Sequence, residues 1–296
     1  MKKLLIWMLM FIPFIGITAQ TRTATLKHQG ATQVFKGRDA FSLAYDVAVD
    51  GDEIVLSNGE FWGVDINKSI TITGADTELL NQTTTIFDMG GLGYKAPVTV
   101  SLNNLVIDNT LDIDYDCVVT AELCKFNGSV SVVGRNPRDN PDKINPPTMT
   151  FKKCIFEHKL FISAGTATLT NCGIKTAQTD IHANVVFDHC TFIHQDMSLR
   201  ENTTLKNCLL VFYNDYYTYG PTEYCYYNGP QIVDWSEKAN VSNCVKYFNG
   251  SGYEAEREIF NPQSNPYDLK AQYAEKWLGN DGTQVGMYGG TDPYPY

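Results

Sequence analysis

A cysteine that recurs every 18 residues constrains the fold of this chain more than any other feature. The regular series is Cys154, Cys172, Cys190 and Cys208, and Cys244 follows two periods later, while Cys124 lies one period plus 12 residues upstream of Cys154. The residues three positions before the regular series and Cys244 are all apolar: Phe151, Leu169, Phe187, Leu205 and Val241. A fixed period near 20 residues with an apolar frame predicts a solenoid, in which each turn buries its face on the next.

The residue directly before the cysteine indicates a bend. The residues three before and two after the cysteine are both apolar, yet a straight strand would place them on opposite faces. Asn171, Asn207 and Asn243 occupy the position before the cysteine. Asparagine tolerates a left-handed backbone, and its side chain can bond to nearby backbone or to an equivalent residue in another coil. We therefore interpret these asparagines as structural rather than catalytic.

The first 19 residues have the pattern of a signal peptide. A basic start, Met1–Lys3, precedes an apolar run, Leu4–Ile17, and Ile17-Thr18-Ala19 fits a cleavage site. The apolar run is too short for a comfortable span of a bilayer about 30 Å thick. We therefore expect an exported protein that is periplasmic, cell-surface or secreted. Its mature part, 20–296, is expected to form a single β-helix domain with no membrane span after cleavage.

The charge balance limits the partners. Removal of Lys2 and Lys3 leaves 21 basic against 33 acidic residues, a net charge of −12. This excess of negative charge argues against nucleic acid and against anionic membrane surfaces. The same charge would repel a polyanionic glycan, unless cations bridge the glycan and the protein. The sequence contains no zinc signature, nucleophile elbow, phosphate loop or dinucleotide fingerprint.

Eight cysteines in an exported chain would ordinarily indicate disulfides. One thiol per turn at a single phase, however, places sulfurs about 4.8 Å apart with parallel Cβ vectors, which do not suit the bond. The pattern favours a ladder of small buried hydrophobic side chains instead. Cys117 and Cys225 lie off the phase, and they are the pair we expect if any disulfide forms.

The segment Arg38–Gly74 predicts a first coil of the solenoid that is covered by a cap. Asp39 can cap a short helix, and Gly51 suits the left-handed residue that ends it. One face of that helix would be apolar: Ala40, Leu43, Ala44, Val47 and Ala48. A helix over the first coil would hide a sheet edge and so prevent end-to-end aggregation.

Coil length separates two parallel-coil architectures. A left-handed helix would have 18-residue coils built from three hexapeptides, whereas this chain has no hexapeptide period and its coils vary from 18 to about 30 residues. The sequence therefore predicts an all-β fold, a right-handed parallel β-helix with a short N-terminal capping helix. The segments 51–61 and 66–74 resemble the first coil of the pectin-lyase-like superfamily, the repeated Asn-Cys units resemble its coils, and 267–270 and 281–290 resemble its last coil. The resemblance covers nearly the whole mature chain.

This resemblance implies an association with carbohydrate, since the superfamily includes polysaccharide lyases, hydrolases and binding proteins. Its lyases often use Lys or Arg to abstract a proton from the sugar carbon next to a carboxylate. Arg135, Arg138 and Lys143 are residues of that type, in the insertion between Cys124 and Cys154. Loops on a rigid scaffold often carry function. The alternative is a solvated, proline-rich loop.

Asp112, Asp114 and Asp116 alternate with apolar residues. On a strand they would share one outward face, about 6.7 Å apart. Calcium prefers several oxygen ligands at about 2.4 Å, so these carboxylates would need help from loops or neighbouring coils to bind it. The resemblance supports calcium, because pectate lyases of the superfamily bind it through surface carboxylates. The alternative is an acidic, solvated strand face.

A cluster of aromatic residues interrupts the period between Cys208 and Cys244. Our candidates for sugar stacking are Tyr213, Tyr216, Tyr217, Tyr219, Tyr226, Tyr227 and Trp235. Aromatic rings offer flat apolar faces with a polar edge, which suit sugars. The alternative is a loop that packs its rings on the wall of the solenoid.

These features lead to a functional hypothesis with one alternative. The chain is expected to bind polysaccharide and, if it is an enzyme, to act as a lyase or glycoside hydrolase. The outward residues two before the cysteines form no carboxylate cluster, which weakens the enzymatic version: Lys152, Thr170, Asp188 and Lys206. The alternative is a non-catalytic structural or adhesive protein of the cell envelope.

Overall fold

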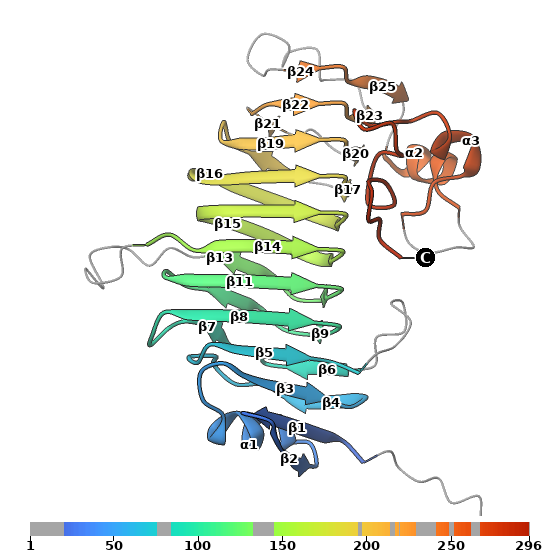
Figure 1. Ribbon diagram of the computed structural model, residues 1–296. Helices are drawn as coiled ribbons and strands as arrows, with labels where there is room; N and C mark the ends of the chain where they lie inside the picture. The colour runs from blue at the N-terminus through green and yellow to red at the C-terminus, as the bar shows by residue number, and fades with distance from the viewer. Residues whose placement is uncertain are drawn as a thin grey trace, which may run out of the picture.

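The strands stack into a parallel β-solenoid of about eight turns, shown along its length in Figure 1. The computed structural model describes residues 21–75, 84–132, 145–194, 197–213, 217–218, 220–228, 241–248, 252–261 and 267–295. Strands on the near side of Figure 1 run left to right as the chain climbs, so the winding is right-handed. The predicted all-β, right-handed parallel β-helix is therefore confirmed. The predicted signal peptide, 1–19, lies outside the described residues.

Each complete coil contributes one strand to each of three sheets, which we name A, B and C in chain order. Sheet A contains β3 (Asp52–Leu56), β5 (Ile70–Thr73), β8 (Val98–Asn103), β11 (Cys117–Glu122), β14 (Thr148–Lys152), the ends of β15 (Ile155–Thr170) and β16 (Gly173–Asp188), β19 (Thr203–Lys206), β22 (Thr222–Glu223) and β24 (Val241–Ser242).

Sheet B contains β4 (Gly59–Trp62), β6 (Thr84–Phe87), β9 (Val106–Ile107), β12 (Lys125–Phe126), the starts of β15 and β16, β17 (Thr191–His194), β20 (Leu209–Phe212), β23 (Tyr226–Asn228) and β25 (Val245–Phe248). Sheet C contains β7 (Gly91–Leu92), β10 (Leu111–Ile113), β13 (Val130–Val132), the middles of β15 and β16, β18 (Ser198–Leu199) and β21 (Tyr217–Thr218). Strands within each sheet are parallel and stack along the axis, which makes a continuous interior.

The bend from sheet A to sheet B has a left-handed residue in every coil from β8 to β24. These residues have φ between 50° and 58°: Asn104, Leu123, Lys153, Asn171, His189, Asn207, Tyr224 and Asn243. The predicted bend before the cysteine is therefore confirmed. It is not limited to asparagine, although left-handed backbone costs other L-residues roughly 1–2 kcal/mol. The stacked coils hold residues such as Leu123 in this conformation.

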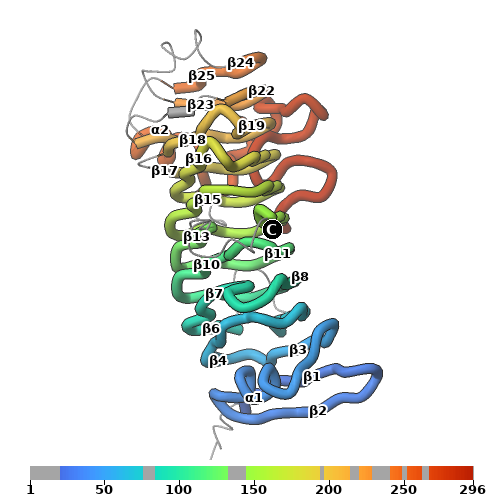
Figure 2. The backbone as a smooth tube through the Cα atoms, turned by 90° about the vertical axis from the view of Figure 1, so that its left-hand side faces the viewer, coloured from blue at the N-terminus to red at the C-terminus, as the bar shows by residue number. Residues whose placement is uncertain are grey.

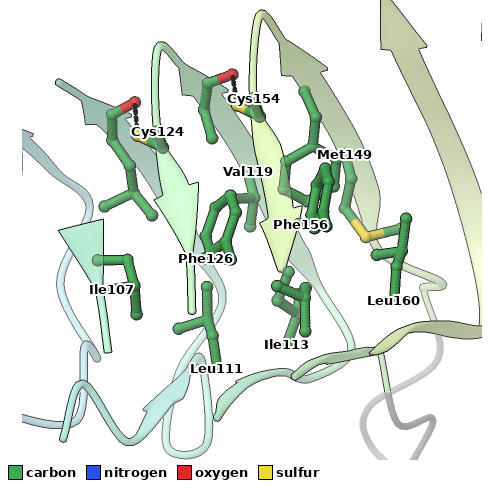
Figure 3. Packing of buried hydrophobic residues seen from close by; sticks show 14 of the residues in the cluster. Ile107, Leu111, Ile113, Val119, Cys124, Phe126, Met149, Cys154, Phe156 and Leu160 are labelled. Carbon is green, nitrogen blue, oxygen red and sulfur yellow. Dashed lines mark hydrogen bonds between the residues drawn. The ribbon is translucent and has the colours of Figure 1, made fainter. Parts of the chain in front are cut away.

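The thiols form the predicted buried ladder, and all eight cysteines are free. The prediction that Cys225 lies off the phase was wrong, whereas Cys117 does lie off it. Cys225 lies on the ladder, because the coils on either side of it are one residue shorter and one residue longer than the period, while Cys117 begins β11. Ladder thiols from Cys124 to Cys208 donate to carbonyls of the preceding coil, as Cys190 does to Leu169 O at 3.4 Å. Figure 3 shows Cys124 and Cys154 in successive coils.

Aromatic and aliphatic side chains fill the space beneath the thiols. Phe126 and Phe156 stack with ring centroids 5.0 Å apart, and Phe151 meets both rings edge-on (Figure 3 shows the first two). Full burial of one such side chain contributes roughly 1.5–3 kcal/mol. Repetition of these contacts from coil to coil makes the interior the main source of stability.

Helix α1 (Ala40–Val47) occurs where the sequence predicts it, but it buries a different face. Phe41 and Tyr45 are buried, whereas Leu43 and Val47 are 47% and 54% exposed. The predicted apolar face was therefore partly wrong, because the larger aromatic pair occupies the core. The side chain of Asp39 makes no capping hydrogen bond. The role of α1 as a cap stays a prediction.

An antiparallel hairpin extends sheet A at the N-terminal end. β1 (Thr23–His28) pairs with β3 on one side and with β2 (Ala31–Lys36) on the other. Its turn places Gln29 and Gly30 at φ 46° and 85°, as a two-residue type I′ hairpin requires. This hairpin was not predicted from the sequence, although a Gln-Gly pair between alternating segments is a signal that marks such a turn.

After the solenoid, the chain forms α2 (Gly252–Ile259) and α3 (Ala271–Ala274) and then returns along the bends. We call Trp277–Tyr294 the C-terminal strap; it is the red tube beside the coils in Figure 2.

In the described part of the chain, no helix is long and apolar enough to cross a membrane.

Candidate functional site

A depression in the described surface lies on the outer face of sheet A. It measures about 350 Å³ and is lined by Thr71, Ser101, Asn103, Thr120, Ala121, Glu122, Thr150 and Lys152. A second depression of about 260 Å³ shares Thr71 and Ser101 and adds Gly51, Ser69, Ile70 and Thr99. The two depressions adjoin at Thr71 and Ser101. The first crosses the neighbouring strands β5, β8, β11 and β14 along the axis, and we call it the groove.

Parallel register produces a row of hydroxyl groups in this groove. Thr71, Ser101, Thr120 and Thr150 are direct partners in successive strands. Neighbouring strands lie about 4.8 Å apart, so the hydroxyls repeat at that interval. The Ser101 and Thr120 hydroxyls are 2.9 Å apart and share a hydrogen bond. Each hydroxyl can donate one bond and accept others, so the row can match a polymer rich in hydroxyls.

One ion-pair cluster lies beside the hydroxyl row. Lys152 Nζ is 3.5 Å from Glu122 Oε1 and 2.5 Å from Asp292 Oδ2 of the strap. The hydrogen bond with Asp292 raises the pKa of Lys152, and the bonds from Lys152 and Lys153 lower the pKa of Asp292 to about 2. Because these side chains are exposed, water screens the pair and its contribution to stability is small. It does fix the position of the Lys152 ammonium group at the groove.

The strap follows the left-handed bends from Asn207 back to Lys153 and so reaches the groove at β14. Asn207 Nδ2 donates to Asn280 Oδ1 at 3.1 Å, and Asn171 Nδ2 donates to Gly289 O at 2.7 Å. Lys153, one coil earlier, reaches Asp292 at 2.5 Å. The prediction that such asparagines bond to backbone holds for Asn171, but the backbone belongs to a segment more than 100 residues away.

Arg135, Arg138 and Lys143, the predicted catalytic candidates, lie outside the described residues. Their insertion ends just before β14, a strand of the groove. Asp116 anchors that end, because its Oδ1 accepts bonds from the backbone and side-chain nitrogens of Asn145 at 3.2 and 2.7 Å. The insertion is therefore joined to the groove at the start of β14.

The three predicted calcium ligands do not form one outward row. Strand β10 ends at Ile113, and Asp114 is buried, with its Oδ1 accepting a bond from the backbone N–H of Tyr115. Asp112 instead accepts a bond from the Tyr94 hydroxyl at 3.1 Å. Asp116 instead accepts hydrogen bonds from Asn145 at the end of the insertion. Among the described residues, no group of three or more His, Cys, Asp or Glu side chains is placed to hold a metal ion. Calcium binding stays a prediction.

The described members of the aromatic cluster pack in different directions. Tyr226 stacks on Trp277 with centroids 5.3 Å apart, whereas Tyr227, its neighbour on β23, packs against the interior. Tyr213 meets Tyr253 edge-on at 4.3 Å. Tyr216, Tyr219 and Trp235 lie outside the described residues, and Tyr217 is placed only as part of β21. Tyr226 and Tyr227 therefore cannot present one shared platform.

No family model matches this sequence, and no curated protein or solved structure is significantly similar to it.

Proposed function

We propose that this chain is an exported protein of the pectin-lyase-like type and that its sheet A groove binds a polysaccharide. The observation that carries the proposal is the row of hydroxyls from Thr71 to Thr150, repeated at the coil spacing along a groove. A linear glycan presents hydroxyls along its whole length, so an extended groove can contact several sugar units. Asn103, Glu122 and Lys152 add an amide and two charges beside that row.

Binding without turnover fits the described part of the groove better than catalysis. A lyase needs a base, but the raised pKa and the bonds of Lys152 to Glu122 and Asp292 keep its ammonium group protonated. If the protein is a lyase, the base comes from Arg135, Arg138 or Lys143, which precede β14. The lyase version is tested by absorbance of unsaturated products from uronate polysaccharides, with and without calcium.

Calorimetric titration against a panel of neutral and uronate glycans tests the binding proposal. The variant Thr120→Val with Thr150→Val removes two hydroxyls and keeps the β-branched shape. Each lost hydrogen bond weakens binding by about 1 kcal/mol, so we expect roughly tenfold or greater loss of affinity. Thr168→Val removes an outward hydroxyl one coil beyond the groove and serves as the matched control, with unchanged affinity.

Two results would decide against the groove. Binding that survives the double variant would place the glycan elsewhere on the molecule. Absence of binding to every glycan would favour the alternative, a structural or adhesive protein of the cell envelope.

A further inference from the structure

The N-terminal end of sheet A has an edge strand, β2, whose outer side pairs with no other strand in the described ranges. Gly37 N donates to Arg22 O, which fixes the hydrogen-bond phase of the antiparallel pair β1–β2. In such a pair, alternate residues direct both backbone groups at the partner strand. The N–H and C=O groups of Thr32, Val34 and Lys36 therefore point away from β1, toward the open edge.

This edge lacks the features by which proteins usually block strand pairing. Edge strands are commonly protected by proline, by inward charges, by bulges or by lysines along the strand. The strand Ala31–Lys36 has neither proline nor a bulge in its pairing with β1, and its one charged residue is Lys36 at its end. Val34, at its middle, is 54% exposed.

Apolar side chains of the adjacent helix are exposed at the same end of the molecule. Leu43 and Val47 lie one turn apart on α1, and Val49 follows; all three are about half exposed. Helix α1 lies beside β1 and β2, as Figure 1 shows. The open edge and these helix side chains therefore lie at the same end of the molecule, and we call them together the end face.

We propose that this end face binds a second copy of the chain. Strand β2 pairs antiparallel with β2 of the partner, and the two-fold axis passes between the two Val34 residues. This register is self-complementary. Val34 faces its equivalent on the axis, and Lys36 of each copy faces Thr32 of the other, so like charges are not opposed. The pairing joins the outward backbone groups of both strands, with α1 of each copy beside the paired strands.

Crosslinking tests the register. Val34→Cys places two thiols on the axis, where opposed Cα atoms in a hydrogen-bonded antiparallel pair lie about 5.5 Å apart, within disulfide range. We expect a reducible dimer under mild oxidation of the chain beginning at Gln20. Thr32→Cys is the matched control, because two-fold pairing sets its equivalent residues about 13 Å apart. Equal crosslinking of both variants, or of neither, would overturn the proposal.

Sedimentation measurements test the association itself. We expect the chain to form a concentration-dependent dimer, and Val34→Lys to abolish it by opposing two ammonium groups on the axis. Val186→Lys adds the same charge at another exposed strand position and should leave the dimer intact. A monomer at every concentration would overturn the proposal, as would a dimer that persists in a folded Val34→Lys variant.

Discussion

His189 Nε2 lies 3.2 Å from Asp281 Oδ2, which joins a bend of the solenoid to the C-terminal strap. The other ring nitrogen, Nδ1, lies 3.0 Å from Asp188 Oδ1, and the Thr283 hydroxyl is 3.2 Å from Nε2. Burial by itself would lower the pKa of His189, but the hydrogen bond and charge of Asp188, together with Asp281, outweigh burial and raise it. The protonated imidazole therefore links the Asp188 carboxylate of the solenoid to the Asp281 carboxylate of the strap.

We predict that the strap is weakened as the pH rises. A folded-state pKa above the ordinary value of about 6.5 gives stability that is complete below that value and lost as the pH rises through the raised pKa. The lowered pKa values of Asp188 and Asp281 give stability that is lost only in acid, as the pH falls through them. Thermal unfolding should show a lower Tm at pH 8.5 than at pH 5.5, by a few °C.

The matched variant for this prediction is His189→Asn. Asparagine tolerates the left-handed backbone at this position, φ 50°, but does not titrate. The Tm difference between the two pH values should shrink in this variant. An unchanged difference would show that other groups cause it.

The contacts of Asn207 predict a second effect on stability. Its side chain donates to Asp188 Oδ1 at 2.9 Å and accepts from the Asn280 backbone at 2.8 Å, besides the bond to the Asn280 side chain. Asn207→Gly keeps the left-handed backbone, φ 53°, and loses these bonds, at a cost of about 2 kcal/mol. Asn207→Ala should cost about 1 kcal/mol more, because alanine is strained there. Chemical denaturation measures both, and equal costs would contradict this account of the bend.

The fold was predictable because one local pattern repeats. Each Cys of the ladder marks a bend and each apolar pair marks a core position, so the period alone predicts stacked coils. The assignment of Cys225 failed because the chain lengths on either side of it deviate in opposite directions and cancel. Three sheets per coil and the strands of the hairpin β1–β2 carry weaker signals.

The site was less predictable than the fold. The groove depends on register between strands such as β8 and β11, which fixes that Ser101 lies beside Thr120. The strap depends on contacts such as Asn171 with Gly289, between segments with no shared local pattern. The alternation around Asp114 suggested a longer strand, but the chain turns after Ile113 and buries that carboxylate.

The left-handed bends between sheets A and B also predict a stabilising substitution. Leu123 is half-buried and has a left-handed backbone, φ 58°. This conformation is strained for leucine, whereas asparagine tolerates it. Leu123→Asn should raise the free energy of unfolding by about 0.5–1 kcal/mol. Thr168→Asn introduces the same residue at an extended strand position, where asparagine is disfavoured, and should be neutral or destabilising. A loss of stability in Leu123→Asn would indicate that its side-chain packing outweighs the backbone strain.

The thiol ladder predicts how the protein responds to reductant and to thiol reagents. All eight cysteines are free, so reductant should leave the Tm unchanged. Cys244, in the last coil, is partly exposed and has a lowered pKa because it accepts a bond from Cys225, whereas the other seven thiols are buried. Thiolate is the reactive form. Iodoacetamide should therefore label one thiol in the folded protein and eight in denaturant, and Cys244→Ser should remove the folded-state label. Labelling of several thiols under native conditions would show that the coils open far more readily than their packing implies.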